Sequence, residues 1–418
     1  MTLSEEILWR GFSAKTTLET PTALDSRDSK KFYWGADPSA DSLTIGNLAA
    51  LMMCACFARH GYEPYLLVGG ATGQIGDPKE NGERDLKPLS EVDHNKACIK
   101  NQLSRIFVNA APSARITFLD NLDWFREIKF LDFLREIGKS FSMTQLLDRQ
   151  FVQNRIGKDG SGISYAEFSY TLIQGYDFLH LFRKYGVSLQ LCGADQYGNC
   201  ASGIHLIKRL ENAAADIWST PLVIDPVSGK KFGKSEGNAV WLASEPSATD
   251  SDNFTSVFDF YQFWLNQPDS AVESLLKTYT LLEKPELDAL LASHQSAPER
   301  RLAQTALAKG ATSVVHGAKI AETVAWATDF LFSKSPDYSE ENLRSLESVF
   351  GGFSWGETET LLDVLVKTSL VSSKSEARKL LQSGAISFNG EKLSSETFRP
   401  TASGILKRGK NKFALISQ

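Results

Sequence analysis

The first half of the chain alternates short apolar runs with stretches of helical periodicity, and this rhythm restricts the fold more than any other feature. Residues 32–36 and 62–69 are apolar runs of strand length, and residues 48–59 between them have helical periodicity. Two further short strands are expected at residues 116–119 and 188–191. Strands that alternate with helices in this way are typical of a parallel sheet with helical connections. The sequence therefore predicts an α/β domain.

The composition changes after this half of the chain. Residues 243–252 are polar and rich in serine, which is typical of a joint between domains. Residues 254–334 have helical periodicity without a strand candidate and predict a small all-helical domain. A second joint is expected within residues 335–355. Beyond it, helices are expected at residues 361–365 and 375–383, and strands at residues 385–389, 404–406 and 412–416.

The charge of the chain is distributed unevenly. The whole chain has a net charge of −5. Residues 361–418 contain ten Lys and Arg against four Asp and Glu, a net charge of +6, so the remainder carries −11. A basic end on an acidic body is typical of an RNA-binding appendix, although a merely solvated tail would have the same charge.

Other bulk features exclude several classes of protein. No run of 18 apolar residues is present, so a membrane span is not expected. The first residues contain Glu5 and Glu6 and lack an apolar core, so they are not expected to act as a signal peptide. The five cysteines have no paired CxxC spacing, which favours free thiols in a reducing cytoplasm.

Residues 37–47 form a polar turn between the first expected strand and the following helix. Gly46 would let the backbone approach a ligand, and N–H groups at a helix N-terminus favour anions. Ser39, Thr44 and Asn47 add hydrogen-bonding side chains to the same turn. A polar turn without a ligand is the more common role of such a segment, so this feature alone does not identify a site.

A loop punctuated by glycines carries Lys230, Lys231 and Lys234. Such a cation cluster is suited to the charge of a polyphosphate during reaction. It is not a Walker-type loop, because no GxxxxGK[ST] pattern precedes a helix here. A solvated surface loop is the alternative.

Tyr170, Gln174 and Asp177 are spaced four and three residues apart, which places them on one face of a helix. Their neighbours are apolar. If this face is buried, a bound polar small molecule would satisfy its hydrogen bonds. If it faces water, the stripe needs no ligand, and this is the more common arrangement.

Taken in order, these segments resemble the class I aminoacyl-tRNA synthetases, and among them the tyrosyl branch of bacterial type. Residues 33–47 resemble the first signature, whose usual core is His-Ile-Gly-His, and residues 231–235 resemble the second, usually Lys-Met-Ser-Lys-Ser. Segments that resemble the tyrosyl branch or its RNA-binding module are residues 68–78, 170–177, 193–199, 261–264, 371–380 and 384–390.

The resemblance implies three domains. Residues 1–245 would form a Rossmann-like catalytic domain with a doubly wound parallel sheet and a helical dimerisation insertion at about 124–165. Residues 246–335 would form a helical anticodon-binding domain, and residues 356–418 an S4-like α+β RNA-binding domain.

The resemblance also implies a tyrosine–tRNA ligase that activates L-tyrosine with ATP and transfers the tyrosyl group to the 3′ end of tRNA(Tyr). ATP would be a substrate that brings Mg²⁺, with no tightly bound metal or organic cofactor. The protein would be a cytoplasmic homodimer that does not bind a membrane.

The site residues follow from the same motifs. For tyrosine they are Tyr33 and Asp177 at the phenol, Tyr170, Gln174 and Asp77 at the amino group with Asn121 in support, and Gln196 near the carboxylate. For ATP they are Asp37, Ser39, Gly46, Gly193, Asp195, Lys231, Lys234 and Ser235. The catalytic residues would be Thr44, Asn47, Lys231 and Lys234.

Thr44 and Asn47 stand where the first signature usually has histidines. Either side chain can donate a hydrogen bond, but neither can carry a positive charge, so pyrophosphate would be stabilised less than by a charged histidine. Ala194 and Tyr197 are further departures, beside the expected ribose site.

Two alternatives remain at this stage. A tryptophanyl enzyme shares the fold but must bind an indole N–H, whereas Tyr33 with Asp177 favours a phenol. A paralogue that has lost aminoacylation and only binds RNA would account for the altered first signature.

Overall fold

The chain forms two compact units in the computed structural model. The structure describes residues 1–78, 85–147, 150–156, 162–225, 229, 232, 239–247, 251–333, 335–409 and 412–417. One unit comprises residues 1–256 and 263–317, and the other comprises residues 257–262 and 318–418. In the described ranges no helix combines the length and the apolar character needed to cross a membrane.

The first unit is built on a five-stranded sheet with the order β3-β2-β1-β4-β5. All neighbouring pairs are parallel, and Tyr33 of β1 lies opposite Tyr65 of β2 and Gln190 of β4. The strands are β1 (Lys31–Ala36), β2 (Glu63–Val68), β3 (Thr117–Leu119), β4 (Leu189–Gly193) and β5 (Asp216–Thr220). The predicted α/β class with a Rossmann-like parallel sheet is confirmed, and β5 is a strand that the apolar runs did not indicate.

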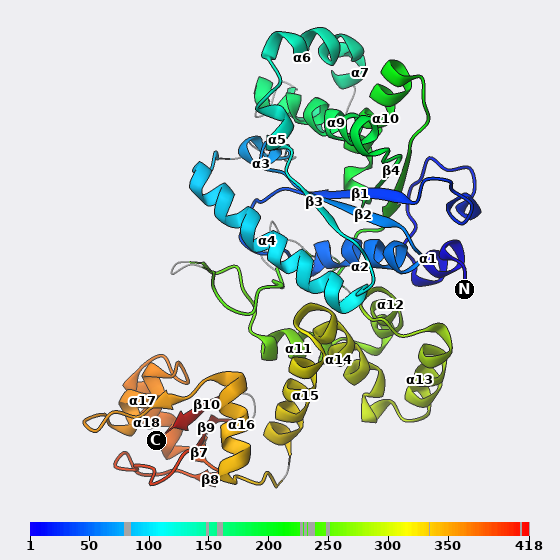
Figure 1. Ribbon diagram of the computed structural model, residues 1–418. Helices are drawn as coiled ribbons and strands as arrows, with labels where there is room; N and C mark the ends of the chain where they lie inside the picture. The colour runs from blue at the N-terminus through cyan, green and yellow to red at the C-terminus, as the bar shows by residue number, and fades with distance from the viewer. Residues whose placement is uncertain are drawn as a thin grey trace. The chain divides into compact units, whose positions relative to one another are not determined.

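Helices cover both faces of this sheet. Figure 1 shows α2 (Ile45–Arg59) and α4 (Leu89–Ala110) on one face, and α9 (Tyr165–Tyr185) and α10 (Tyr197–Glu211) on the other. The ends of α9 are set by local chemistry. The Ser164 side chain accepts a hydrogen bond from the Glu167 backbone N–H at its start, and Gly186 adopts a left-handed conformation with a φ of 67° at its end.

The segment between β3 and α9 is a series of short helices. They are α5 (Leu122–Phe125), α6 (Phe130–Glu136), α7 (Met143–Leu147) and α8 (Gln150–Ile156). Arg155 of α8 and Glu167 of α9 form a buried ion pair in which Nη1 and Nη2 of the guanidinium each lie 2.8 Å from a carboxylate oxygen. The helical insertion predicted at about residues 124–165 therefore takes the form of several one- to two-turn helices in its described part.

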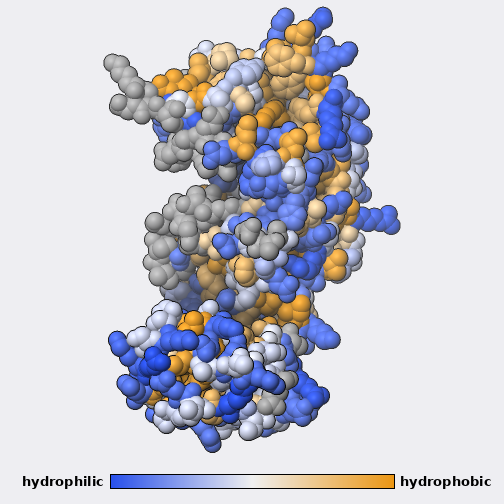
Figure 2. All heavy atoms as spheres, turned by 90° about the vertical axis from the view of Figure 1, so that its left-hand side faces the viewer, coloured by the Kyte–Doolittle hydropathy of each residue, from blue (hydrophilic) through white to orange (hydrophobic). Residues whose placement is uncertain are grey.

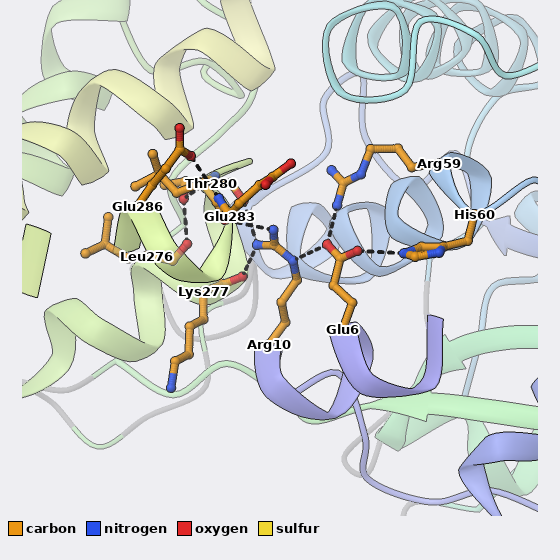
Figure 3. Close-up of polar contacts among 10 residues, drawn as sticks. Glu6, Arg10, Arg59, His60, Leu276, Lys277, Thr280, Glu283 and Glu286 are labelled. Atoms are coloured by element: carbon orange, nitrogen blue, oxygen red, sulfur yellow. Dashed lines mark hydrogen bonds and ion pairs between the residues drawn. The ribbon is translucent and has the colours of Figure 1, made fainter. Parts of the chain in front are cut away.

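The N-terminal helix α1 (Leu3–Arg10) is bound to the rest of its unit by a cluster of charged side chains (Figure 3). Glu6 accepts from Arg10, Arg59 and His60 at 2.7, 2.6 and 2.7 Å. Burial by itself would raise the pKa of Glu6, but the hydrogen bonds from His60 and Arg10, with the charge of Arg59, lower this pKa to about 2.

Arg10 also joins α1 to the end of α12 (Asp269–Tyr279). Its guanidinium donates to the backbone carbonyls of Lys277, Thr280 and Leu282 at 2.9, 2.9 and 3.0 Å. Carbonyls at a helix C-terminus lack intrahelical partners, so a buried cation is a suitable donor for them. Two helices follow in this unit, α13 (Lys284–Ser296) and α14 (Leu302–His316), and α3 (Thr72–Ile75) lies near the strand ends.

The second unit contains a separate five-stranded sheet with the order β6-β10-β9-β7-β8. Buried apolar side chains of α17 and α18 form a core with this sheet, and α15 and α16 pack on Ile405 and Leu415. The elements are α15 (Ala318–Phe332), α16 (Glu340–Phe350), β6 (Phe353–Ser354), α17 (Leu361–Lys367), α18 (Lys374–Gln382), β7 (Ile386–Phe388), β8 (Glu391–Lys392), β9 (Gly404–Arg408) and β10 (Lys412–Ser417).

Helix α11 (Val257–Leu265) contributes residues to both units. The region from residue 254 onward is helical up to α15, in agreement with the periodicity. The division into catalytic, anticodon-binding and RNA-binding domains stays a prediction, because compactness does not show what each segment binds.

Candidate active site

The predicted site residues gather where the strands of the parallel sheet end. Asp37 follows β1, Gly69 and Gly70 follow β2, and Gly193 ends β4. The strand order reverses at β1, since β2 lies on one side of it and β4 on the other. Open parallel sheets bind their ligands outside the carboxyl ends of the strands at such a reversal. The topology therefore places the candidate site here.

Three buried polar atoms in this region have no hydrogen bond to the described part of the chain. They are the Tyr33 hydroxyl of β1, Gln174 Oε1 of α9 and Gln190 Oε1 of β4. Buried polar groups in proteins nearly always have a partner. Three unpaired atoms on neighbouring elements therefore point to a site for a polar ligand.

Asp177 of α9 is buried beside these groups, with an exposed fraction of 2%. Its carboxylate accepts from Trp124 Nε1 and from Asn121 Nδ2, both at 3.0 Å. Burial raises the pKa of Asp177 to about 8, although both donors act to lower it. Burial is the largest cause that raises the pKa of Tyr33 well above its usual value; the neighbouring Cys200 and then Asp177 add to this increase, while Gln190 beside it acts to lower the pKa. The buried carboxyl group of Asp177 beside the Tyr33 phenol can accept a hydrogen bond from a further hydroxyl group.

Trp124 is a functional candidate that the sequence analysis missed, because nothing in its local pattern indicates which carboxylate it meets. Its indole stacks on His180, with ring centroids 4.4 Å apart. Asn121 lies at Asp177 and bonds also to Thr72 Oγ1 at 3.1 Å, while its own Oδ1 accepts from the Ala71 N–H at 2.7 Å.

Other residues that are predicted to bind the substrate tyrosine are hydrogen-bonded to two acidic side chains. Tyr170 donates to Asp37 Oδ2 at 2.8 Å, and Gln196 donates to Asp77 Oδ2 at 2.8 Å. Burial, and then the charge of Asp37, raise the pKa of Tyr170 well above its usual value, so this phenol stays neutral. Asn199 donates to the second oxygen of Asp77 at 3.1 Å. The carboxylates of Asp37 and Asp77 favour a cationic group such as an ammonium.

The turn after β1 is held in place by α4, an element that the sequence analysis did not assign. Asn95 donates to the Pro38 carbonyl at 3.0 Å, and Gln102 accepts from the Leu43 N–H at 2.9 Å. Ser39 lies in this turn, where its N–H donates to the Asp37 carbonyl at 2.8 Å. Side chains from a neighbouring helix thus position the first signature.

The first signature also pairs with the chain that follows the second. The Ile45 N–H donates to the Val240 carbonyl at 3.0 Å, and the Leu242 N–H donates to the Leu43 carbonyl at 2.9 Å. A Cβ atom on Gly46 would lie 2.8 Å from the Phe232 carbonyl oxygen. Gly46 is therefore needed for a close approach of protein backbone, in addition to any ligand.

Lys231, Lys234 and Ser235 lie outside the described residues, as does Lys230. The predicted ribose contacts Gly193 and Asp195 lie together at the end of β4, where a Cβ on Gly193 would be 2.7 Å from Asp195 Oδ1. The described residues of the site thus come from β1, α2, α9, the end of β4 and the segment after it, and from the segments that carry Asp77 and Asn121.

One cluster elsewhere has the composition of a metal site. Glu6, Cys56 and His60 have ligand atoms within 4.8 Å of one another, the only such group in the described residues. Arg10 and Arg59 already pair with Glu6, and burial raises the pKa of the Cys56 thiol to about 12. Two guanidinium groups and a protonated thiol disfavour a metal cation here.

A parallel sheet with polar groups at the carboxyl ends of its strands is typical of enzymes that bind a nucleotide. Residues 25–333 match the family model described as tRNA synthetases class I (W and Y), and residues 353–416 match the C-terminal domain described as tyrosine–tRNA ligase SYY-like.

Individual relatives indicate which branch of this family the chain resembles. The chain is 38% identical to a tyrosine–tRNA ligase of Bifidobacterium longum over 94% of this chain and 90% of that one, and 37% identical to one of Bacteroides fragilis over 100% and 99%. It is also similar to a C-terminally truncated mitochondrial tyrosyl-tRNA synthetase of Aspergillus nidulans, with a TM-score of 0.69, 28% identity, and coverage of 79% of this chain and 94% of that one. The chain belongs to the tyrosine–tRNA ligase family.

Proposed function

We propose that this protein joins L-tyrosine to tRNA(Tyr) in two steps, through a tyrosyl-adenylate made from ATP. The buried pair of Tyr33 and Asp177 carries the proposal, because a hydroxyl without a partner and a buried carboxylate together suit a phenol. The phenol O–H of tyrosine would donate to Asp177, and the Tyr33 hydroxyl would donate to the phenol oxygen. Phenylalanine would leave the carboxylate without this bond, and this family is a standard example of such discrimination.

The amino group of tyrosine would bind at the acidic end of the site. Asp77 and Tyr170 would accept and orient the ammonium, with the Oε1 of Gln174 as a further acceptor. Gln196 would lie near the substrate carboxylate. Since Asp37 already accepts from Tyr170 at 2.8 Å, it would orient that phenol as well as line the nucleotide side.

In the first step, a carboxylate oxygen of tyrosine attacks the α-phosphorus of ATP. A new P–O bond forms, the bond to the bridging oxygen of pyrophosphate breaks, and pyrophosphate leaves with the negative charge. Mg²⁺ that arrives with ATP would share this charge with Lys231 and Lys234, and Ser39, Ser235 and the first signature would add hydrogen bonds. No covalent enzyme intermediate is required.

In the second step, a hydroxyl of the terminal adenosine of the tRNA attacks the carbonyl carbon of the adenylate, and AMP leaves. The second unit would bind the tRNA. Ion pairs in this unit occupy Lys367, Lys374, Arg378 and Arg408. RNA phosphates would therefore depend on other exposed cations, such as Lys379 and Lys392.

A homodimer is proposed through the short helices after Trp124. Phe130, Leu131 and Met143 there have exposed fractions of 64, 75 and 58%, and apolar side chains gather on the surface in the upper part of Figure 2. Large exposed apolar patches commonly mark protein interfaces. The proposed location is the cytoplasm, where the substrates ATP and tRNA are available.

Tyrosine-dependent exchange of pyrophosphate into ATP tests the first step. Exchange with tyrosine and not with phenylalanine or tryptophan is expected. If pure, folded protein shows no exchange, it is a paralogue without this activity, and exchange with tryptophan instead would refute the specificity.

Charge reversal tests the RNA-binding proposal better than truncation, because residues 361–418 also cover apolar side chains of α15 and α16. The double variant Lys379→Glu/Lys392→Glu should keep the exchange rate and raise the KM for tRNA in charging. Lys30→Glu, at an exposed position before β1, is the matched control. Unchanged charging by the double variant would contradict the assignment.

A further inference from the structure

The two residues that replace the usual signature histidines are hydrogen-bonded to each other. Thr44 immediately precedes α2, and Asn47 lies in its first turn. The Thr44 N–H and the Thr44 hydroxyl both donate to Asn47 Oδ1, at 3.0 and 3.1 Å. Thr44 is buried, with an exposed fraction of 4%, whereas Asn47 is half-buried.

This arrangement determines which way the Asn47 amide faces. A backbone N–H can only donate, so the side-chain atom that meets it must be the oxygen. The Asn47 NH₂ group therefore points away from Thr44, and it has no hydrogen bond to the described part of the chain. The orientation of this donor follows from two bonds that both come from Thr44.

The same geometry leaves the Thr44 side chain without a hydrogen to donate to a substrate. A hydroxyl has one hydrogen, and that of Thr44 is directed at Asn47 Oδ1. It cannot donate to ATP at the same time. Of the two side chains that replace the histidines, only Asn47 keeps a donor without a hydrogen bond to the described residues, and it lies in the first turn of α2, where an anionic ligand is favoured.

We propose that the two replacements act in series: Asn47 Nδ2 donates to an oxygen of ATP, and Thr44 is a positioning residue that holds the Asn47 amide in the donating orientation. Two signature histidines would each offer a donor, so their effects could be independent. In this protein a single donor, Asn47 Nδ2, and the residue that orients it, Thr44, replace the two histidines. This inference rests on the proposed nucleotide role of the first signature.

A double-mutant cycle in tyrosine-dependent pyrophosphate exchange tests the series arrangement. Asn47→Ala should lower kcat/KM for ATP about tenfold, as for the loss of one hydrogen bond. Thr44→Val should lower it about threefold to tenfold in the wild type but less than about twofold when Asn47→Ala is present. Thr44→Ser keeps the hydroxyl, so this variant should have a kcat/KM for ATP close to that of the wild type. Losses that multiply in the double variant would show that Thr44 contacts ATP itself and would overturn the proposal.

Asn47→Asp provides a second test if Thr44→Val proves unstable. A carboxylate can accept both bonds from Thr44, and an acid in the first turn of a helix is favourable, so this variant should fold. It has no outward N–H₂ group and adds a negative charge near the phosphates. Exchange should fall more than about 100-fold, with tyrosine affinity and Tm unchanged. A rate close to that of the wild type would overturn the proposal.

These outcomes are separate from failure of the function itself. If the wild type shows no exchange with tyrosine, the proposed enzyme activity is wrong. If the wild type is active and the losses multiply, the activity stands and only the series arrangement is wrong.

Discussion

Replacing Asp177 by asparagine should change how the stability of the substrate-free protein depends on pH. The carboxyl group of Asp177 is buried among Tyr33, Trp124 and Asn121, and burial raises its pKa from 3.8 to about 8. In the unfolded chain the same group would titrate near its ordinary value. The folded protein therefore holds a proton between about pH 4 and pH 8 that the unfolded chain releases.

The sign and size of the effect follow from this difference. Stability from Asp177 is fully present below the unfolded pKa and is lost as pH rises toward the folded pKa of about 8. One proton corresponds to about 1.4 kcal/mol per pH unit, so up to about 4 kcal/mol should be lost between pH 5 and pH 8. The asparagine side chain of the variant would not titrate, so the unfolding free energy of the variant would not decrease with pH for this reason.

Urea unfolding of the wild type and Asp177→Asn at pH 5 and at pH 8 measures the effect. The difference in unfolding free energy between the two proteins cancels all groups that they share, including Glu6 and His316, whose pKa values are also shifted. This difference should change by up to about 4 kcal/mol in favour of the variant as pH rises. Parallel pH profiles would refute the reasoning, since they would mean that Trp124 and Asn121 keep the buried carboxylate ionised.

Three further variants test other parts of the structure. Gly46→Ala should lower the rate of adenylate formation, because the new Cβ would lie 2.8 Å from the Phe232 carbonyl oxygen, and a wild-type exchange rate would contradict this. Arg155→Met should lower the unfolding free energy by about 3–5 kcal/mol by removing the guanidinium that pairs with the buried Glu167 carboxylate, and adding Glu167→Leu should recover most of this loss in urea unfolding. For Glu6, with a pKa lowered to about 2, the stabilising effect is present above about pH 4.5 and is lost as pH falls toward 2. The stability difference between wild type and Glu6→Gln should therefore shrink in acid, and a constant difference would argue against the pairing.

The local pattern of the sequence determined the class of fold and most of its elements. Apolar runs located the central strands β1, β2 and β4, because a strand inside a parallel sheet is covered on both faces and needs apolar residues along its length. They also located β3, although this edge strand is only partly buried. The four- and three-residue spacing correctly placed Tyr170, Gln174 and Asp177 on one helix. The family followed from motifs that are each contiguous in the chain, and the comparisons confirm it.

The tertiary structure alone decided which of these side chains meet. Trp124 and Asn121 donate to Asp177 although they lie more than fifty positions away in the chain. Asn95 and Gln102 of α4 form hydrogen bonds to the turn that follows β1. Periodicity states which face of an element is polar, but a hydrogen bond between distant residues depends on how the elements pack. Even Thr44 and Asn47, three residues apart, could be recognised as replacements from the sequence but not as partners. Their dependence on each other follows from the two hydrogen bonds that the Thr44 N–H and hydroxyl donate to Asn47 Oδ1, and only the folded chain forms these bonds.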